Sequence, residues 1–545
     1  MKLGSRRAVA LACLGACAVA GAQEHVVEFR VSERDTLIGL SGSVFAGPHA
    51  WREIARLNRL PDPNRIYPGQ VLRVPARLMR MKPLPVALAS SVGDVRVGGA
   101  PARPGMALSE GQHLETGANG SAVLALADGS RVKLPPSSLA EIVASRAPGA
   151  NEAQAARLAS EGWFAGSMRM LRGSVEVLAA RLRRSQPLEV STPTGVAGVR
   201  GTQYRVSLDG DSGATRSEVL EGRVRLESPQ RSAGADIPAG FGAEMDARAQ
   251  TPEPVRLLPP PDLGAMPARF ERPLVRFALP TEQATVRVQV AQDEAFERIV
   301  SDSKVIAGSD VRIAGLDDAR WFLRARRLDG QGIEGHDAVR PFVLKARPEP
   351  PASNAPRAGG KQSLGPVEFR WSPNIEAKST RLQVARDEGF RELVAEREGL
   401  EGTSLTLELP GAGVYHWRLA STRADGDKGP FGDALRFELR PLPQPPQGGL
   451  SGDGKSLTLS WSGRPQDTQH VELARDPQFT QIVAQADLNA PEWILPRPSQ
   501  PGTYFFRYRS IEPDGFVGPY SSPLVIEVPR DWRYLWLLTP LLLLL

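Results

Sequence analysis

The chain has 545 residues, with 53 glycines, 48 prolines and only 2 cysteines, and its formal net charge at pH 7 is +6. This length corresponds to roughly three to six domains of about 100 residues each. Without the three basic residues of the first segment, Lys2, Arg6 and Arg7, the net charge is +3. So small an excess excludes nucleic acid as an expected partner. The six histidines are scattered with no two at zinc-ligand spacing, so we expect no metal site and no cofactor.

Residues 1–22 have the form of a secretory signal peptide, with basic residues, an apolar run and a small-residue cleavage site at Ala20-Gly21-Ala22. Both cysteines, Cys13 and Cys17, lie inside it. Cleavage after Ala22 leaves a mature chain without cysteine. The alternative is lipidation of Cys17, because residues 14–17 are similar to a lipobox. Either route predicts export to the periplasm or cell envelope.

The other end of the chain is apolar. Residues 532–545 combine tryptophan, arginine and tyrosine with a run of leucines, as at a membrane interface. As a helix this tail measures about 21 Å, against roughly 30 Å of hydrocarbon in a bilayer. We expect it to insert partway into a membrane or to dock on an envelope protein partner.

The first folded segment alternates between strand and helix signals. Val26 to Val31 predicts a strand, Asp35 or Ser32 can cap a helix, and Trp51, Ile54, Ala55 and Leu57 recur at helical spacing. Pro68-Gly69-Gln70 predicts a turn before a closing strand from Val71 to Val74. The predicted order is therefore βααβ.

Residues 26–76 resemble a LysM module. The resemblance is carried by Phe29, Val31, Asp35-Thr36-Leu37, Asn58, Ile66, Pro68-Gly69-Gln70, Leu72 and Pro75. The chain departs from the family at Gly39-Leu40, where an Ile-Ala pair is usual. The resemblance implies binding of N-acetylglucosamine-containing glycans such as peptidoglycan, in a groove between two loops formed by Asp35, Thr36, Leu37, Asn64, Arg65, Ile66 and Tyr67. We expect Asn58 to cap a helix end.

Residues 86–250 predict an all-β domain, because short apolar-polar alternations are separated by turn residues. A polar insert around residues 147–162 is predicted as a surface excursion or a short helix. The stretch Ser191 to Val206 reads STPTGVAGVRGTQYRV, where glycines set tight turns between two strands. It resembles the signature of the FecR domain. The residues concerned are Thr192, Pro193, Gly198, Val199, Arg200, Gly201, Thr202 and Tyr204.

We interpret this FecR motif chiefly as a structural turn, with Arg200 bridging loops. The alternative is that Arg200 presents a binding surface to a partner. A phosphate-binding loop is excluded, because no lysine-serine or lysine-threonine pair and no helix follow the glycines. Glu218 and Glu221 are predicted to lie in solvent on an exposed hairpin.

Three segments repeat without gaps, starting at Val288, Leu382 and Val471, with a period of about 90 to 96 residues. With their alternating strands they predict three β-sandwiches, at 266–347, 360–441 and 449–529. They resemble fibronectin type III or other immunoglobulin-like domains. In each A-x-D-x-x-F element the Asp is predicted to cap a turn and the Phe, at 296, 390 or 479, to pack into the core. A calcium site at Asp293 and Glu294 is disfavoured, because each repeat supplies few carboxylates.

The predicted protein is multidomain and mainly β: a LysM module, a FecR-like all-β domain and three sandwiches. No G-x-S-x-G elbow is present, and no segment is left over for a catalytic domain. The sequence favours a non-enzymatic envelope protein that binds peptidoglycan and presents a sensing or scaffolding domain on a sandwich arm. A peptidoglycan-acting enzyme and a surface adhesin are the alternatives. Direct control of a sigma factor is disfavoured, because the predicted export signal and LysM module stand where such regulators carry a cytoplasmic domain.

Overall fold

The computed structural model describes residues 26–182, 186–199, 201–230, 233–246, 248, 251–279, 285–306 and 308–530. The predicted signal peptide, the apolar tail and Arg200 lie outside the described residues. The chain divides into two compact units, residues 1–344 and 345–545. The first holds the βααβ module, a β-barrel and one sandwich; the second holds two further sandwiches.

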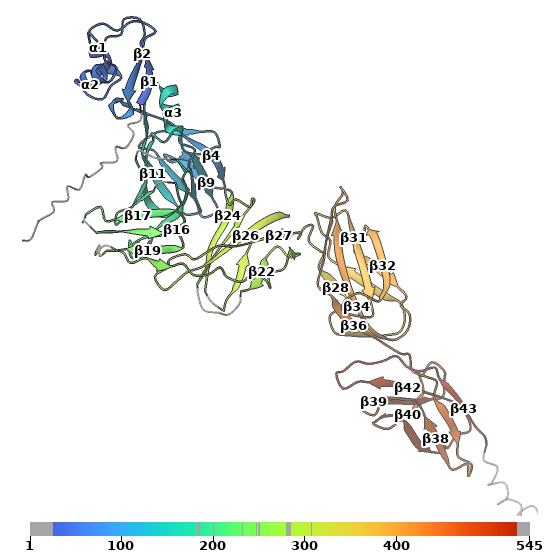
Figure 1. The fold of residues 1–545 in the computed structure, drawn as a ribbon. Coiled ribbons are helices and arrows are strands. Elements are labelled where there is room, and N and C mark those ends of the chain that lie inside the picture. Colours follow the sequence, from blue (N-terminus) through green and yellow to red (C-terminus); the bar gives the residue numbers. More distant parts are fainter. Residues whose placement is uncertain are drawn as a thin grey trace, which may run out of the picture. The chain divides into compact units, whose positions relative to one another are not determined.

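The N-terminal module has the predicted order: β1 (Val26–Arg30), α1 (Leu37–Ser43), α2 (Ala50–Leu57) and β2 (Val71–Pro75) (Figure 1). The cap of α1 is Thr36, whose side chain accepts a hydrogen bond from the Gly39 amide at 3.0 Å. Asp35, one of the two predicted caps, instead accepts a hydrogen bond from the Ser32 amide at 2.7 Å. The prediction for the cap residue was therefore wrong by one position.

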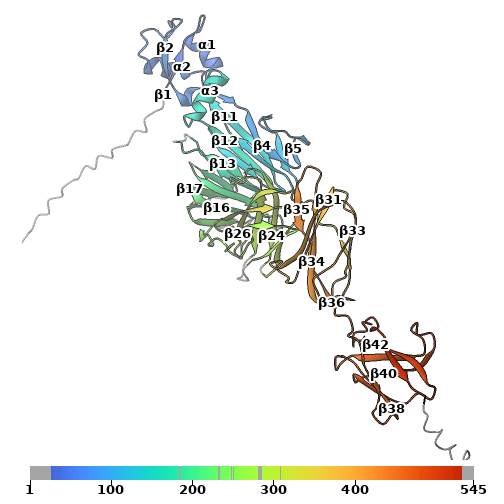
Figure 2. The same cartoon turned by 90° about the vertical axis from the view of Figure 1, so that its right-hand side faces the viewer.

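The strands from β3 to β20 close into a barrel with a single apolar interior. Figure 2 shows β11, β12 and β13 side by side, as their pairing requires. The strands are β3 (Met81–Pro83), β4 (Val86–Val92), β5 (Val95–Val97), β6 (Ala100–Pro101), β7 (Ala107–Leu108), β8 (His113–Thr116), β9 (Ser121–Ala125), β10 (Arg131–Leu134), β11 (Leu139–Pro148), β12 (Ala165–Leu178), β13 (Leu188–Ser191), β14 (Val196–Val199), β15 (Gln203–Leu208), β16 (Thr215–Glu221), β17 (Arg223–Glu227), β18 (Gly234–Pro238), β19 (Phe241–Met245) and β20 (Val255–Arg256).

The 14-residue strand β12 joins the two halves of the barrel. Its first part pairs with β11 and its last part with β10 and β15. Gly173 lies at the change of partner with φ +80°, and a Cβ there would stand 2.6 Å from the Ser137 carbonyl oxygen. Only glycine satisfies both conditions without strain. This change of partner carries β12 from the sheet that contains β11 to the sheet that contains β15.

The polar insert forms helix α3 (Glu152–Ser160), capped by the Asn151 side chain. It is not a mere surface excursion, because Ala155, Leu158 and Ala159 are buried. Leu158 packs in the same apolar cluster as Ile54 and Leu72 of the N-terminal module. Helix α3 therefore joins that module to the barrel.

Each predicted repeat forms two sheets. The first sandwich consists of β21 (Arg269–Phe270), β22 (Val275–Ala278), β23 (Val286–Ala291), β24 (Ile299–Val305), β25 (Asp310–Ile313), β26 (Ala319–Arg327) and β27 (Ala338–Leu344). The second consists of β28 (Ser353–Ala355), β29 (Gly360–Ser363), β30 (Val367–Trp371), β31 (Ser379–Ala385), β32 (Leu393–Leu400), β33 (Ser404–Leu407), β34 (Gly413–Thr422), β35 (Lys428–Phe431) and β36 (Leu435–Arg440). The third consists of β37 (Gln447–Leu450), β38 (Ser456–Ser460), β39 (Thr468–Ala474), β40 (Ile482–Leu488), β41 (Glu492–Pro496), β42 (Gly502–Ile511) and β43 (Leu524–Val528).

The A-x-D-x-x-F element has the same geometry in all three sandwiches. The Asp caps the turn as predicted: Asp293, for example, accepts hydrogen bonds from the amides of Glu297 and Arg298 at 3.0 and 2.9 Å. The Phe that follows has a positive φ, between 54° and 58°. It is buried, and its ring lies beneath an arginine of the neighbouring strand. The predicted burial of the Phe is therefore confirmed, and Phe296 packs with Ala291 and Ile299 in a small apolar cluster of the first sandwich.

Candidate functional site

The two loops that the LysM resemblance assigns to glycan binding leave the same end of the two-stranded β1–β2 sheet. Arg30 at the end of β1 pairs with Val71 at the start of β2. Beyond this pair the Val31 amide donates to the Gln70 carbonyl, and the Gly69 amide donates to the Val31 carbonyl, both at 2.8 Å. The loops after β1 and before β2 are therefore held next to each other by backbone hydrogen bonds.

The side chains of these loops differ in what they can offer a ligand. Thr36, Asn64 and Arg65 are exposed, and Tyr67 is 64% exposed. Leu37 is only 1% exposed and belongs to the module's core, so it can offer backbone groups alone. Asp35 and Ile66 are half-buried.

Ile38 was not among the predicted glycan-binding residues, yet its apolar side chain is 60% exposed on the first turn of α1. Its neighbour Leu37 takes the core position, so the helical spacing turns Ile38 outward. An exposed isoleucine beside the Asp35-Thr36-Leu37 turn adds apolar surface to this end of the module. The signal was present in the sequence as two consecutive apolar residues, of which only one can face the core.

Asn58 fixes α2 to β2. Its Nδ2 donates to the carbonyls of Ile54 and Arg73 at 2.8 and 2.7 Å, and its Oδ1 accepts from the Arg73 amide at 2.6 Å. It is the C-cap of α2, as expected for a helix-end residue. The Asn58 side chain thus satisfies backbone groups of two elements at once.

We predict that Asn58→Ala lowers the free energy of unfolding of the N-terminal module by about 1 to 3 kcal/mol, because it leaves the amide and the carbonyl of Arg73 without their side-chain partner. Hydrogen exchange of the Arg73 amide, measured at increasing urea concentration, gives the effect. Asn64→Ala is the matched control and should change the stability by less than about 0.5 kcal/mol, since it is exposed. Equal losses in both variants would contradict the assignment.

The FecR motif is folded largely upon itself. Thr192 is 5% exposed, accepts a hydrogen bond from the Gly195 amide at 2.9 Å and contacts the Thr215 hydroxyl. Val199 and Thr202 are also buried, and Gly201 has φ +77°. Pro193 and Gly198 lie in the same turn and in β14, respectively. The described part of the motif serves the barrel's own structure, and Arg200 lies outside it.

A layer of buried charges joins the barrel to the first sandwich. On the barrel side lie Lys133, Glu176, Arg205 and Glu218; on the sandwich side lie Arg287, Arg324, Arg326, Glu334 and Asp337. The Glu176 carboxylate lies 3.1 Å from the Arg324 guanidinium, and Arg205 donates to Asp337 at 2.8 Å. Lys133 donates to the Ala295 carbonyl at 2.5 Å. Each of these three contacts crosses from the barrel to the first sandwich.

Glu218 corrects a prediction from the sequence. It is 1% exposed and accepts a hydrogen bond from the Glu334 amide at 3.1 Å, so it does not lie in solvent. Only Glu221, paired with Arg181, lies on the exposed end of the hairpin. The sequence could not reveal this, because the surface that covers Glu218 belongs to a module more than a hundred residues away.

The electrostatics of the layer differ from group to group. Burial raises the pKa of Glu176, but the guanidinium groups of Arg324 and Arg326 outweigh it and hold that pKa well below its usual range. Burial and the neighbouring Glu334 carboxylate raise the pKa of Glu218 to about 7. The cations neutralise Glu176, Glu334 and Asp337, whereas Glu218 receives less compensation. The arrangement is that of a polar joint between modules.

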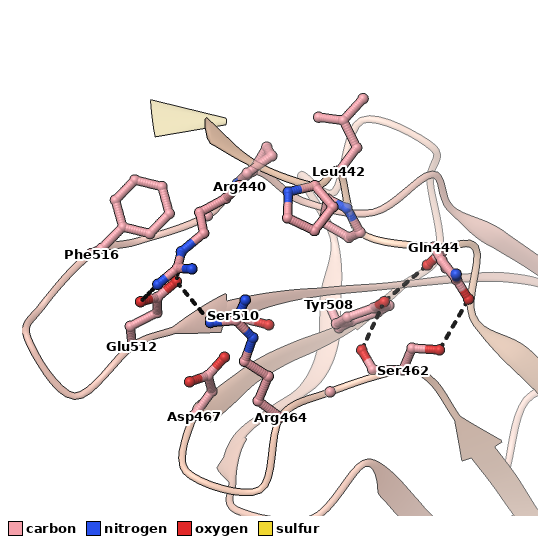
Figure 3. A pocket seen from close by; sticks show the side chains of 15 residues that line it. Arg440, Leu442, Gln444, Ser462, Arg464, Asp467, Tyr508, Ser510, Glu512 and Phe516 are labelled. Carbon is pink, nitrogen blue, oxygen red and sulfur yellow. Dashed lines mark hydrogen bonds and ion pairs between the residues drawn. The ribbon is translucent and has the colours of Figure 1, made fainter. Parts of the chain in front are cut away.

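A hollow of about 310 Å³ lies at the start of the third sandwich (Figure 3). Prolines and Leu442 of the preceding linker form one side, and Tyr508 forms another, donating its hydroxyl hydrogen to the Gln444 carbonyl at 2.9 Å. Arg440 pairs with Glu512 at 2.5 Å. Burial and Glu512 raise the pKa of the Asp467 carboxyl. Because Arg440 closes the second sandwich and Glu512 belongs to the third, this ion pair ties the two together within the second unit.

Comparison with known families identifies two of the modules. Residues 29–75 match the LysM domain family, and residues 112–225 match the family described as FecR protein. The chain thus contains a LysM domain and a FecR domain, followed by three β-sandwiches. LysM domains bind N-acetylglucosamine-containing glycans such as peptidoglycan, and both families are typical of bacterial envelope proteins. Neither is a catalytic family.

Solved structures with similar parts share little sequence with this chain. A proposed anti-sigma factor from Parabacteroides distasonis is 14% identical over 26% of this chain and 59% of its own length, with a TM-score of 0.21. The FN1–FN3 domains of chicken CNTN1 are 14% identical over 48% and 96%, with a TM-score of 0.21. The fibronectin(III)-like modules of Clostridium thermocellum CbhA are 11% identical over 32% and 93%, with a TM-score of 0.20. A comparison with curated proteins finds no match.

Within the described residues no helix is long and apolar enough to span a membrane. In the same part of the chain, no three His, Cys, Asp or Glu side chains are grouped so as to hold a metal ion.

Proposed function

We propose that this protein is a non-enzymatic component of the bacterial cell envelope that binds peptidoglycan through its LysM domain and presents the FecR barrel for sensing or scaffolding. The observation that carries the proposal is the pair of loops at one end of the two-stranded β1–β2 sheet. They are tied together by backbone hydrogen bonds and present exposed Asn64, Arg65 and Tyr67. The glycan would lie between them, along the backbone of Asp35-Thr36-Leu37 and Ile66. A membrane or a further envelope protein would be met by the C-terminal tail.

A single LysM domain offers a shallow, polar surface, so its intrinsic affinity is expected to be modest. Binding to the wall gains from tethering, because a second attachment raises the effective concentration of the domain near its ligand. The FecR barrel and the sandwiches supply no nucleophile paired with a base among the residues that line the described pockets. This supports a binding role over the alternative of a peptidoglycan-acting enzyme.

We predict that the protein from residue 23 onward co-sediments with purified peptidoglycan sacculi and that Asn64→Trp lowers its affinity roughly tenfold or more. Backbone groups are expected to make most contacts with the sugar, so filling the groove is a stronger perturbation than removing one side chain. Tenfold corresponds to about 1.4 kcal/mol. Sedimentation at graded sacculus concentrations gives the apparent Kd.

Glu28→Trp is the matched control, because it adds the same ring at an exposed position in the middle of β1. It should bind sacculi like the unmodified protein. Deletion of residues 26–75 is a less clean comparison, since it uncovers Leu158 of α3. If neither Trp variant changes binding, the groove is not the binding surface; if the unmodified protein does not sediment, the proposed function is wrong.

A further inference from the structure

The three sandwiches present the same polar sheet face. An arginine at the equivalent position of each, Arg324, Arg418 or Arg507, donates to the residue opposite it on the neighbouring strand, Gln289, Gln383 or Glu472, at 3.1, 2.9 and 2.7 Å. Each arginine also lies over the Phe of the A-x-D-x-x-F element, 3.9 to 4.4 Å from the ring centroid. The face is therefore a repeated structure of the fold.

In the second and third sandwiches an aromatic ring of the same domain covers this arginine. The ring centroid of Phe431, in β35, lies 4.2 Å from the guanidinium carbon of Arg418. Tyr520 lies 3.8 Å from that of Arg507, and its hydroxyl donates to Glu472 at 2.7 Å. The arginine is thus held between two rings, one beneath it and one above.

The equivalent position in the first sandwich is Asp337. Phe431 pairs with Ala420, two residues after Arg418. In the first sandwich Ala325 pairs with Ala338, which places Asp337 beside Arg326, two residues after Arg324. A carboxylate therefore stands where the other two sandwiches have a ring.

In the first sandwich, residues of the barrel lie where the other two sandwiches have an aromatic ring. Glu176 of β12 reaches the Arg324 guanidinium at 3.1 Å, and Arg205 of β15 donates to Asp337 at 2.8 Å. Arg287 of β23 reaches the Ser174 hydroxyl at 3.3 Å, and Arg131 of β10 pairs with Glu297 at 2.8 Å. Charge complementarity and burial both single out this face as the contact surface.

We propose that the residue at this position selects the partner of each sandwich: Asp337 makes the first sandwich a dedicated docking domain for the FecR barrel, whereas Phe431 and Tyr520 close the same face of the other two. A phenylalanine or tyrosine side chain has no negative charge to pair with Arg205, and its ring would occupy the space above Arg324 that Glu176 enters. The barrel and first sandwich then act as one unit, and only the second and third sandwiches serve as an arm. The first sandwich covers the barrel face around Lys133 and Glu176, so an external partner of the barrel must bind another face.

The test uses Asp337→Tyr and Asp337→Asn in the full chain, with acylation of Lys133 as the readout. Lys133 is 7% exposed and its amine donates to Ala295 of the docked sandwich, so undocking exposes it. We expect Asp337→Tyr to raise the labelling rate of Lys133, measured by mass spectrometry, by about tenfold or more, the change produced by about 1.4 kcal/mol. Asp337→Asn, which keeps the size and removes the charge that balances Arg205, should give a smaller rise. Exposed Lys455 is the internal reference.

Gln331→Tyr is the matched control, because it adds the same ring in the exposed part of the β26–β27 loop. Lys133 should stay protected in it. Hydrogen exchange of the β23 and β26 amides, which bond within the sandwich, distinguishes undocking from unfolding. If the β23 and β26 amides lose their protection in Asp337→Tyr, that variant has unfolded. The labelling of Lys133 in Asp337→Asn then tests the proposal. Unchanged Lys133 labelling in the folded Asp337 variants, or equal labelling in Gln331→Tyr, overturns the proposal.

Discussion

Replacing Arg326 by methionine is expected to lower the free energy of unfolding of the barrel with its sandwich by about 3 to 5 kcal/mol. Arg326 is 3% exposed and lies 2.6 Å from Glu334 and 3.6 Å from Glu176, and it also pairs with Asp337. Methionine keeps most of the side-chain volume but leaves two buried carboxylates, Glu334 and Glu176, and the half-buried Asp337 with one cation fewer. Removal of one partner of a buried ion pair has a cost of this size because the remaining charges are not solvated. Denaturant unfolding, followed at the barrel and at the sandwich, measures the loss.

The matched control is Arg225→Met, which removes an arginine from a pair with Glu227 on the exposed face of β17. The side chains of Arg225 and Glu227 are both about half exposed, so we expect only a small change in the free energy of unfolding. The loss at Arg326 should also be smaller near pH 4, where the carboxylates that it leaves unpaired can take up protons. A loss at Arg326 no larger than at Arg225 would show that the charge layer does not hold the modules together.

The barrel–sandwich joint is expected to become less stable as the pH rises from 5 to 8, by on the order of 1 to 3 kcal/mol. The pKa of Glu218 is raised to about 7 in the folded protein by burial and by Glu334, while Arg205 and Arg326 only partly offset them. A carboxyl group whose folded pKa is raised holds its proton more tightly when folded. Its contribution is complete below the unfolded pKa near 4.5 and is lost as the pH passes through about 7. Thermal unfolding at a series of pH values measures this slope.

Glu218→Gln should remove most of this dependence and stabilise the joint at pH 8, because the amide stays neutral while it can still accept from the Glu334 backbone. Glu221→Gln, at the exposed end of the same strand, is the control and should keep the slope. The lowered pKa values of Glu176 and Asp337 act in the opposite direction and only at acidic pH, where their ionised forms are lost. A slope unchanged by Glu218→Gln would assign the pH dependence to another group.

These two predictions concern residues that local sequence patterns described incompletely. The alternation of the strands, the period of the repeats and the order of the βααβ module all follow from local chemistry, and the structure has them. Asp293 caps its turn because its carboxylate reaches amides four and five residues later in the chain. The ring of Phe296 shows the limit of local patterns. Its apolar character predicts that it is buried, but not that the guanidinium of Arg324, from another strand, covers it.

The sequence by itself determined the classes of the modules, the spacing of the repeats and the positions of the turn residues, because each depends on contacts within a few residues or on a period along the chain. Tertiary structure alone decided that Glu218 is buried, that Leu158 joins the LysM core and that Asp337 stands where Phe431 and Tyr520 stand in their own domains. The physical reason is that burial of a charged group depends on what lies opposite it. For Glu218 and Asp337 that surface comes from a separate module, more than a hundred residues away in the chain.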